Sequence, residues 1–153
     1  MKQISLLLIL CFVFISSSTV LAADGLVSLK SSYSAAETMN RFEAIAKNKG
    51  LNIFARINHT AGAAKIGKTL RPTEVLIFGN PQGGTPFIEC AQTVGIDLPL
   101  KVLVWEDAAG QVWLEYNDPV YLAKRHGVSQ CPAAGKLGKA LAGLSAAALK
   151  VEM

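Results

Sequence analysis

Few residues in this chain could do chemistry, and they are scattered along it. There are two histidines, His59 and His126, and three cysteines, including Cys90 and Cys131. No pair among these four has the spacing of zinc ligands, so neither a metal site nor a cofactor is predicted. A nucleophile with its base and orienting group cannot be found either, so no residue is assigned a catalytic role.

The two histidines have different settings. Residues 51, 53, 55 and 57 alternate with residues 52, 54, 56 and 58, a period of two that predicts a half-buried strand with the first set on one face. His59 stands just past the end of this strand, between Asn58 and Thr60. It could act as an acid or base there, or it could be satisfied by local hydrogen bonds. His126 directly precedes Gly127, where a helix is expected to end, so helix capping explains it without chemistry. An exported enzyme using His59 is therefore kept as the alternative to a non-catalytic binding domain.

A glycine-rich joint offers the best candidate for anion binding. The segment 79–85 (GNPQGGT) is expected to form a turn that leads into a helix starting at Thr85-Pro86. Free N–H groups of Gly83, Gly84 and Thr85 could hold an anion there. The segment lacks a phosphate-loop lysine, so a rigid structural turn is the competing interpretation.

Positive charge gathers upstream of this joint. From Arg41 to Arg71 there are seven basic residues and one acidic residue. Together with the joint, His59, Lys65, Lys68 and Arg71 could attract a small acidic ligand, although a solvated basic surface is the simpler explanation.

Hydrophobic patterns predict the elements that must position these residues. Strands are expected at 25–30, 51–57, 73–78, 99–106 and 111–116, and helices from Ser34 to Gly50, from Thr85 to about Val94, from Pro119 to Arg125 and over about 135–149. The segment 61–70 is expected to form a short helical turn. The result is an α+β domain with about five mostly antiparallel strands and helices packed on one face.

The two tryptophans fall on the predicted hairpin of 99–106 and 111–116. Trp105 belongs to an unbroken apolar run and is expected in the core. Trp113 lies between two apolar residues, so alternation does not assign its face, and it is the candidate aromatic residue for an interface.

The first residues indicate export. Lys2 precedes an apolar run of about a dozen residues, and a small-residue exit ends at Ala22. Residues 1–22 are therefore predicted to be a cleaved signal peptide, and residues 23–153 a single periplasmic or secreted domain without a membrane segment. Losing Lys2 leaves 14 Lys and Arg against 11 Asp and Glu, a net charge too small to predict nucleic-acid binding.

Export also bears on the cysteines. Cys11 lies within the predicted signal peptide, so the mature chain keeps Cys90 and Cys131. An oxidising compartment could join them as a disulfide, and two separate buried thiols are the alternative.

Longer motifs carry a family resemblance. The runs LRPTEVLIFGNP, DLPLKVLVWED and YNDPVYLAKRHG resemble the bacterial and archaeal domain-of-unknown-function family numbered 302, over about residues 25–127, with the C-terminal helix outside this core. The resemblance implies a compact α+β fold similar to the TATA-binding-protein-like (helix-grip-like) architecture, often paired as a dimer. It implies no reaction. The expected function is thus a homodimeric binding or interaction domain with a small acidic ligand, and a pure pairing module is the rival.

Overall fold

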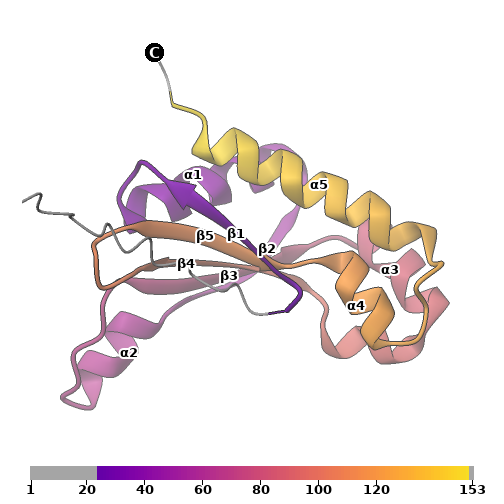
Figure 1. Ribbon diagram of the computed structural model, residues 1–153, viewed down its shortest axis with the longest axis horizontal. Helices are drawn as coiled ribbons and strands as arrows, with labels where there is room; N and C mark the ends of the chain where they lie inside the picture. The colour runs from indigo at the N-terminus through magenta and orange to yellow at the C-terminus, as the bar shows by residue number, and fades with distance from the viewer. Residues whose placement is uncertain (1–23, 152–153) are drawn as a thin grey trace, which may run out of the picture.

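A five-stranded antiparallel sheet forms the centre of the computed structural model, which describes residues 24–151 (Figure 1). The predicted signal peptide lies outside the described residues. The strands are β1 (Leu26–Ser31), β2 (Asn52–Asn58), β3 (Thr73–Gly79), β4 (Leu100–Glu106) and β5 (Val112–Asn117). They lie in the order β1-β5-β4-β3-β2, and each neighbouring pair is antiparallel. The predicted α+β class is confirmed.

Two long helices, α1 (Ala35–Asn48) and α5 (Pro132–Leu149), cover one face of this sheet and contact each other (Figure 1). The core lies between them and the strands. Phe42 of α1 meets Phe78 of β3 edge to face, with ring centroids 5.2 Å apart, and both side chains are fully buried. The prediction of helices on one face is confirmed.

Helix α1 begins and ends where the sequence predicts. The Ser34 hydroxyl accepts a hydrogen bond from the Glu37 N–H at 3.2 Å and so caps the first turn. At the other end Gly50 has φ +73°, a left-handed conformation that side chains rarely adopt. Met39, Phe42 and Ala46 face the sheet between these two signals.

The shorter helices lie at opposite ends of the sheet (Figure 1). Helix α2 (His59–Lys65) follows β2 and has no buried residue. At the other end are α3 (Pro81–Cys90), the 3-10 helix η1 (Gln92–Ile96) and α4 (Pro119–Arg125). Helix α2 projects on the side of the sheet away from α1 and α5 (Figure 1).

The alternation expected along β2 is broken by a bulge. Ile53 pairs with Phe78 on the helix-covered side, but the register shifts before Ala55, which pairs with Ile77. As a result Ile57, opposite Val75, lies on the uncovered side, and 42% of its surface is exposed. The prediction that residues 51, 53, 55 and 57 share one face is therefore wrong.

Trp105 was predicted to lie in the core, but it lies on the other face of the sheet. Val102 and Val104 are fully buried towards the helices, so the residues between and after them, Leu103 and Trp105, point to the other face. There Trp105 pairs with Trp113 and their rings stack with centroids 6.5 Å apart. The expectation that Trp105 belongs to the core is wrong, because this strand is covered on one face only.

Candidate functional site

The predicted anion-binding joint is the first part of α3. The side-chain oxygen of Asn80 accepts a hydrogen bond from the Gly83 N–H at 2.9 Å, and the Asn80 carbonyl oxygen accepts one from the Gly84 N–H at 3.1 Å. Asn80 is thus the N-cap, and Thr85 lies inside the helix rather than capping it. The glycine N–H groups are already paired, so they cannot be offered to an anion.

The basic segment lies at the other end of the sheet from this joint. Strand β3 starts beside α2 and ends at Gly79, just before α3. Its seven residues span about 20 Å at the usual rise per residue. The site predicted from His59, Lys65, Lys68 and Arg71 together with Gly83, Gly84 and Thr85 is therefore not assembled. Of its cations, Arg71 donates through Nε to the Glu106 carbonyl oxygen at 3.2 Å.

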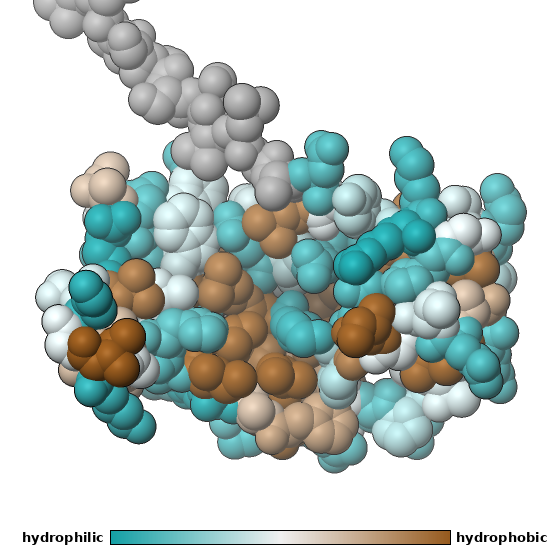
Figure 2. Space-filling model, turned by 90° about the horizontal axis from the view of Figure 1, so that it is seen from below, coloured by the Kyte–Doolittle hydropathy of each residue, from teal (hydrophilic) through white to brown (hydrophobic). Residues whose placement is uncertain are grey.

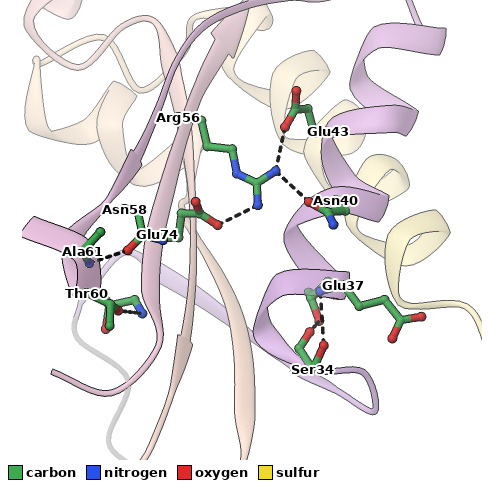
Figure 3. Close-up of polar contacts among 11 residues, drawn as sticks. Ser34, Glu37, Asn40, Glu43, Arg56, Asn58, Thr60, Ala61 and Glu74 are labelled. Carbon is green, nitrogen blue, oxygen red and sulfur yellow. Dashed lines mark hydrogen bonds and ion pairs between the residues drawn. The ribbon is translucent and has the colours of Figure 1, made fainter.

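His59 is the exposed first residue of α2, and its neighbours serve the local structure (Figure 3). The Asn58 side chain caps α2 by accepting from the Ala61 N–H at 2.7 Å. Thr60 Oγ1 donates to the Arg71 carbonyl at 3.0 Å and accepts from the Thr73 N–H at 2.9 Å. Within residues 24–151 no side chain forms a hydrogen bond with the His59 ring, so nothing there orients it for acid–base work.

The structure also brings together a group of residues that no sequence pattern connects. His126 Nε2 lies 2.6 Å from Asp97 Oδ2, its Nδ1 lies 3.0 Å from the Thr93 hydroxyl, and Arg125 binds Asp97 Oδ1 at 3.0 Å. Only 8% of the His126 side chain is exposed. A hydroxyl, an imidazole and a carboxylate in series are components of hydrolytic sites. Here they tie the end of α4 to η1, and none of the three lines the cleft described below.

Cys90 and Cys131 form a disulfide, with Cα atoms 6.1 Å apart. Cys90 is the last residue of α3 and Cys131 is the N-cap residue of α5. The bond therefore joins the end of one helix to the start of the other. Neither cysteine is available as a metal ligand, and no cluster of three His, Cys, Asp or Glu residues lies together in the described part of the chain.

The face of the sheet opposite α1 and α5 has an apolar centre, and we call this face the open sheet face. Figure 2 shows hydrophobic side chains gathered in the middle of the molecule when it is seen from this side. The strand register places these apolar residues on it: Ala55, Ile57, Val75, Ile77, Leu103, Trp105 and Trp113. The same register places these polar residues around them: Ser28, Lys30, Thr73, Lys101 and Glu115. Trp113, the predicted interface residue, thus lies on an uncovered face.

Trp113 is held in place on this face. Its Nε1 donates to Asp107 Oδ2 at 2.9 Å, and this hydrogen bond is the main reason that the pKa of Asp107 lies below its ordinary value. The Lys30 ammonium lies 5.5 Å from the ring centroid. Trp113 is therefore held by a hydrogen bond, a cation–π contact and its stacking on Trp105.

An apolar cleft of about 510 Å³ opens between the end of the sheet and helices α3 and α5. The residues lining it come from these elements and are nearly all apolar or glycine: Leu51, Phe54, Phe78, Gly79, Asn80, Pro81, Gly83, Gly84, Thr85, Ile88, Gly95, Leu98, Pro99, Leu100, Leu137, Ala140, Leu141 and Leu144. This cleft could not be predicted from the sequence, because its walls come from four separate segments. The segment 79–85 does border it, through its side chains and glycines rather than through free N–H groups.

No helix among residues 24–151 is both long and apolar enough to cross a bilayer. Three curated relatives share a segment of 103 residues with this chain at 52% identity, and all are named fluoride-specific ion channels: FluC 1 of Brucella suis, FluC 1 of Brucella abortus and FluC 2 of Brucella melitensis. The segment is 67% of this chain, 41% of the Brucella suis protein and 38% of the other two. The chain thus spans about 40% of the length of these relatives.

A crystal structure of an uncharacterized conserved protein from Bacillus stearothermophilus has the same fold. Its TM-score is 0.65 at 23% identity, over 83% of this chain and 97% of that one. The model of the domain of unknown function DUF302 matches residues 27–145, well past the core boundary predicted at 127 and into α5. The chain therefore belongs to the DUF302 family.

Proposed function

We propose that this protein is a non-catalytic binding domain that acts as a homodimer in the periplasm or outside the cell, and that it pairs through the open sheet face. The observation that carries the proposal is the uncovered apolar surface of a sheet whose other face is covered by α1 and α5. Monomeric proteins rarely expose large contiguous apolar patches, and such patches usually mark interaction sites.

The apolar residues of this face are neighbours across strands, not isolated side chains. Ile57 lies opposite Val75, which lies opposite Leu103, so three strands contribute to one row. The stacked Trp105 and Trp113 continue the surface towards β5. Rigid aromatic residues beside aliphatic ones are typical of the centre of a protein interface.

A second copy of the chain is the occupant that the area and the charges favour. Five strands of about seven residues cover on the order of 500 Å², whereas a stable dimer buries about 800 Å² on each partner. Helix α2 and its loop add apolar surface to this area, because they project on the same side and expose Ile66 (74%) and Leu70. Glu115 on this face is only 6% exposed and accepts a hydrogen bond from the Ser28 hydroxyl at 2.8 Å, so its charge does not keep a second copy away. Lys30 lies on the edge strand β1, at the rim of the surface, where a two-fold pairing leaves its charge in water.

The other functions considered have less support. The acidic-ligand site is not assembled, and His59, as acid or base, has no orienting partner within residues 24–151. Fluoride conduction, which their names give to the Brucella relatives, is not part of the proposed function, because the shared segment is 41% or less of those proteins.

Sedimentation velocity tests the pairing directly. Ile57→Arg places a charge on the open sheet face at a side chain that is already 42% exposed, so the monomer should still fold. Val120→Arg on α4 is the matched control, because Val120 is 51% exposed and lies outside the open sheet face. We expect the wild type and Val120→Arg to sediment as dimers at 20 µM, and Ile57→Arg to dissociate at least 10-fold more readily, since it leaves unpaired charges at the interface.

A wild-type monomer at this concentration would contradict the proposal. So would an Ile57→Arg variant that remains as dimeric as the control while its circular dichroism is unchanged.

A further inference from the structure

We propose that the apolar cleft between the sheet, α3 and α5 is a binding site for a neutral, largely apolar small molecule with a hydrogen-bonding group at one end. This site lies on the helix-covered side of the sheet and is separate from the open sheet face.

Three walls define the cleft. The sheet contributes Phe78 and Leu100, near the end of β3 and the start of β4. Helix α5 contributes Leu137, Leu141 and Leu144, which recur at the spacing of one helical face. The third wall is α3, with Gly84 and Ile88. The volume of about 510 Å³ falls within the range of about 300 to 1,000 Å³ that is usual for small-molecule sites.

The lining chemistry selects against a charged ligand. None of the lining residues is ionisable, so a carboxylate or phosphate inside would lose its hydration without gaining a partner. Two polar side chains, Asn80 and Thr85, border the cleft on the α3 side. Asn80 uses its side-chain oxygen to cap α3, which leaves its amide NH₂ group as a donor for a hydroxyl or carbonyl of the ligand.

Glycine keeps part of this volume open. A Cβ atom added at Gly84 would lie 3.7 Å from Leu98 Cδ1, an ordinary van der Waals contact, so a side chain fits there. Since Gly84 and Leu98 both line the cleft, any atoms beyond Cβ would occupy it. At Gly83 a Cβ atom would lie 3.3 Å from Leu137 Cδ2, so this glycine allows α3 to approach α5 closely.

The disulfide holds the walls in position before a ligand arrives. Cys90 and Cys131 connect α3 to the start of α5, and these two helices form two of the three walls. A preformed site loses less conformational entropy on binding than one that must be assembled. A ligand site between helices that are covalently tied fits this arrangement.

The test uses the neutral fluorescent dye N-phenyl-1-naphthylamine with the full mature chain. We expect its emission to rise on binding, with a Kd in the micromolar range, and decanol to displace it at least 10-fold more effectively than decanoate at pH 7. Gly84→Leu should weaken dye binding at least 10-fold because the leucine fills the cleft. Gly135→Leu, on the exposed side of α5 with nothing within 4 Å of the added Cβ, is the matched control and should bind as the wild type does.

Binding to Ile57→Arg separates this site from the open sheet face: unchanged dye affinity there supports the cleft, and loss of affinity there overturns it. No binding by the wild type, or equal affinity of Gly84→Leu and Gly135→Leu at unchanged melting temperature, would also overturn the proposal. Decanoate displacing the dye as well as decanol does would show that the ligand class is wrong.

Discussion

Arg56 of β2 joins the sheet to helix α1 through polar contacts (Figure 3). Its Nη1 donates to Asn40 Oδ1 at 2.7 Å and to Glu43 Oε2 at 3.0 Å, both on α1. Its Nη2 donates to Glu74 Oε2 of β3 at 2.8 Å. The guanidinium thus connects three elements, and these contacts raise its own pKa, with Glu74 as the largest cause.

The bulge in β2 makes this junction possible. Without the register shift between Ile53 and Ala55, residue 56 would point to the open sheet face. Sequence alternation alone therefore placed Arg56 on the wrong side, because the extra residue of a bulge is invisible in a hydrophobic pattern.

Glu43 should make the stability of the protein depend on pH in the acid range. The hydrogen bond from Lys47, followed by that from Arg56, holds the pKa of Glu43 below its ordinary value of 4.5. A lowered folded-state pKa contributes stability above the unfolded pKa, and this contribution is lost as the pH falls through the folded value. We expect Glu43→Gln to cost about 1 kcal/mol at pH 7 and progressively less between pH 5 and pH 3, measured by urea unfolding.

Glu89→Gln, which removes an exposed carboxylate of α3, is the control and should change unfolding by less than about 0.5 kcal/mol at either pH. A Glu43→Gln deficit that stays constant down to pH 3 would show that the carboxylate charge is not involved.

Helix α3 starts earlier in the chain than the predicted position at Thr85. The segment contains two pairs of a capping residue followed by proline, Asn80-Pro81 and Thr85-Pro86, and the helix was predicted to start at the second pair. The structure starts the helix at Pro81, so Pro86 lies inside it. Two adjacent glycines, which are poor helix formers, hid the helix from a pattern-based prediction.

The cap can be tested by paired substitutions. Asn80→Ala removes the hydrogen bond to the Gly83 N–H and should lower the free energy of unfolding by about 1 kcal/mol, whereas Asn80→Ser should retain most of the stability. Thr85→Ala should have little effect, since Thr85 caps no helix. Chemical denaturation of the three variants measures this, and a larger loss for Thr85→Ala than for Asn80→Ala would reverse the assignment.

Other elements were predictable because their signals are local. Helix α1 has a cap, an apolar face and a terminal glycine, and α4 has Asp118 capping before Pro119. The hairpin of β4 and β5 turns through Gly110 at φ +79°. Contacts between distant segments were not predictable in this way. Asp97 and His126 are 29 residues apart, and nothing in either neighbourhood indicates their contact.

In the whole molecule, the proposed pairing surface and the apolar cleft lie on opposite sides of one sheet. The open sheet face carries the surface proposed for pairing, and the helix-covered side carries the apolar cleft at the α3 end. Since β3 and β4 contribute to both, a ligand in the cleft would contact the strands that carry the pairing surface. The prediction of an anion site was wrong because it combined two distant segments. The basic segment and the glycine-rich joint each have a composition that favours anions, but β3, a strand of about 20 Å, separates them.

Export and the disulfide should be linked in the whole molecule. Full-length chain made in a bacterium is expected in the periplasm with the intact mass of residues 23–153, without thiols that react with an alkylating reagent. A variant lacking residues 2–22 stays in the reducing cytosol and should have two reactive thiols. Closing a loop between positions 41 residues apart stabilises by about 3 to 4 kcal/mol, so this variant, purified and unfolded in urea with its thiols blocked, should be less stable by that amount.

The double variant Cys90→Ser, Cys131→Ser is the control, since it should lose the same stability even when exported. Periplasmic wild-type protein with two free thiols would contradict the predicted link between export and the disulfide. An exported double variant as stable as the wild type would show instead that the tie between α3 and α5 adds nothing to the fold. In that case the walls of the cleft are held by packing alone, for example by the close approach of α3 to α5 at Gly83, where an added Cβ atom would lie 3.3 Å from Leu137 Cδ2.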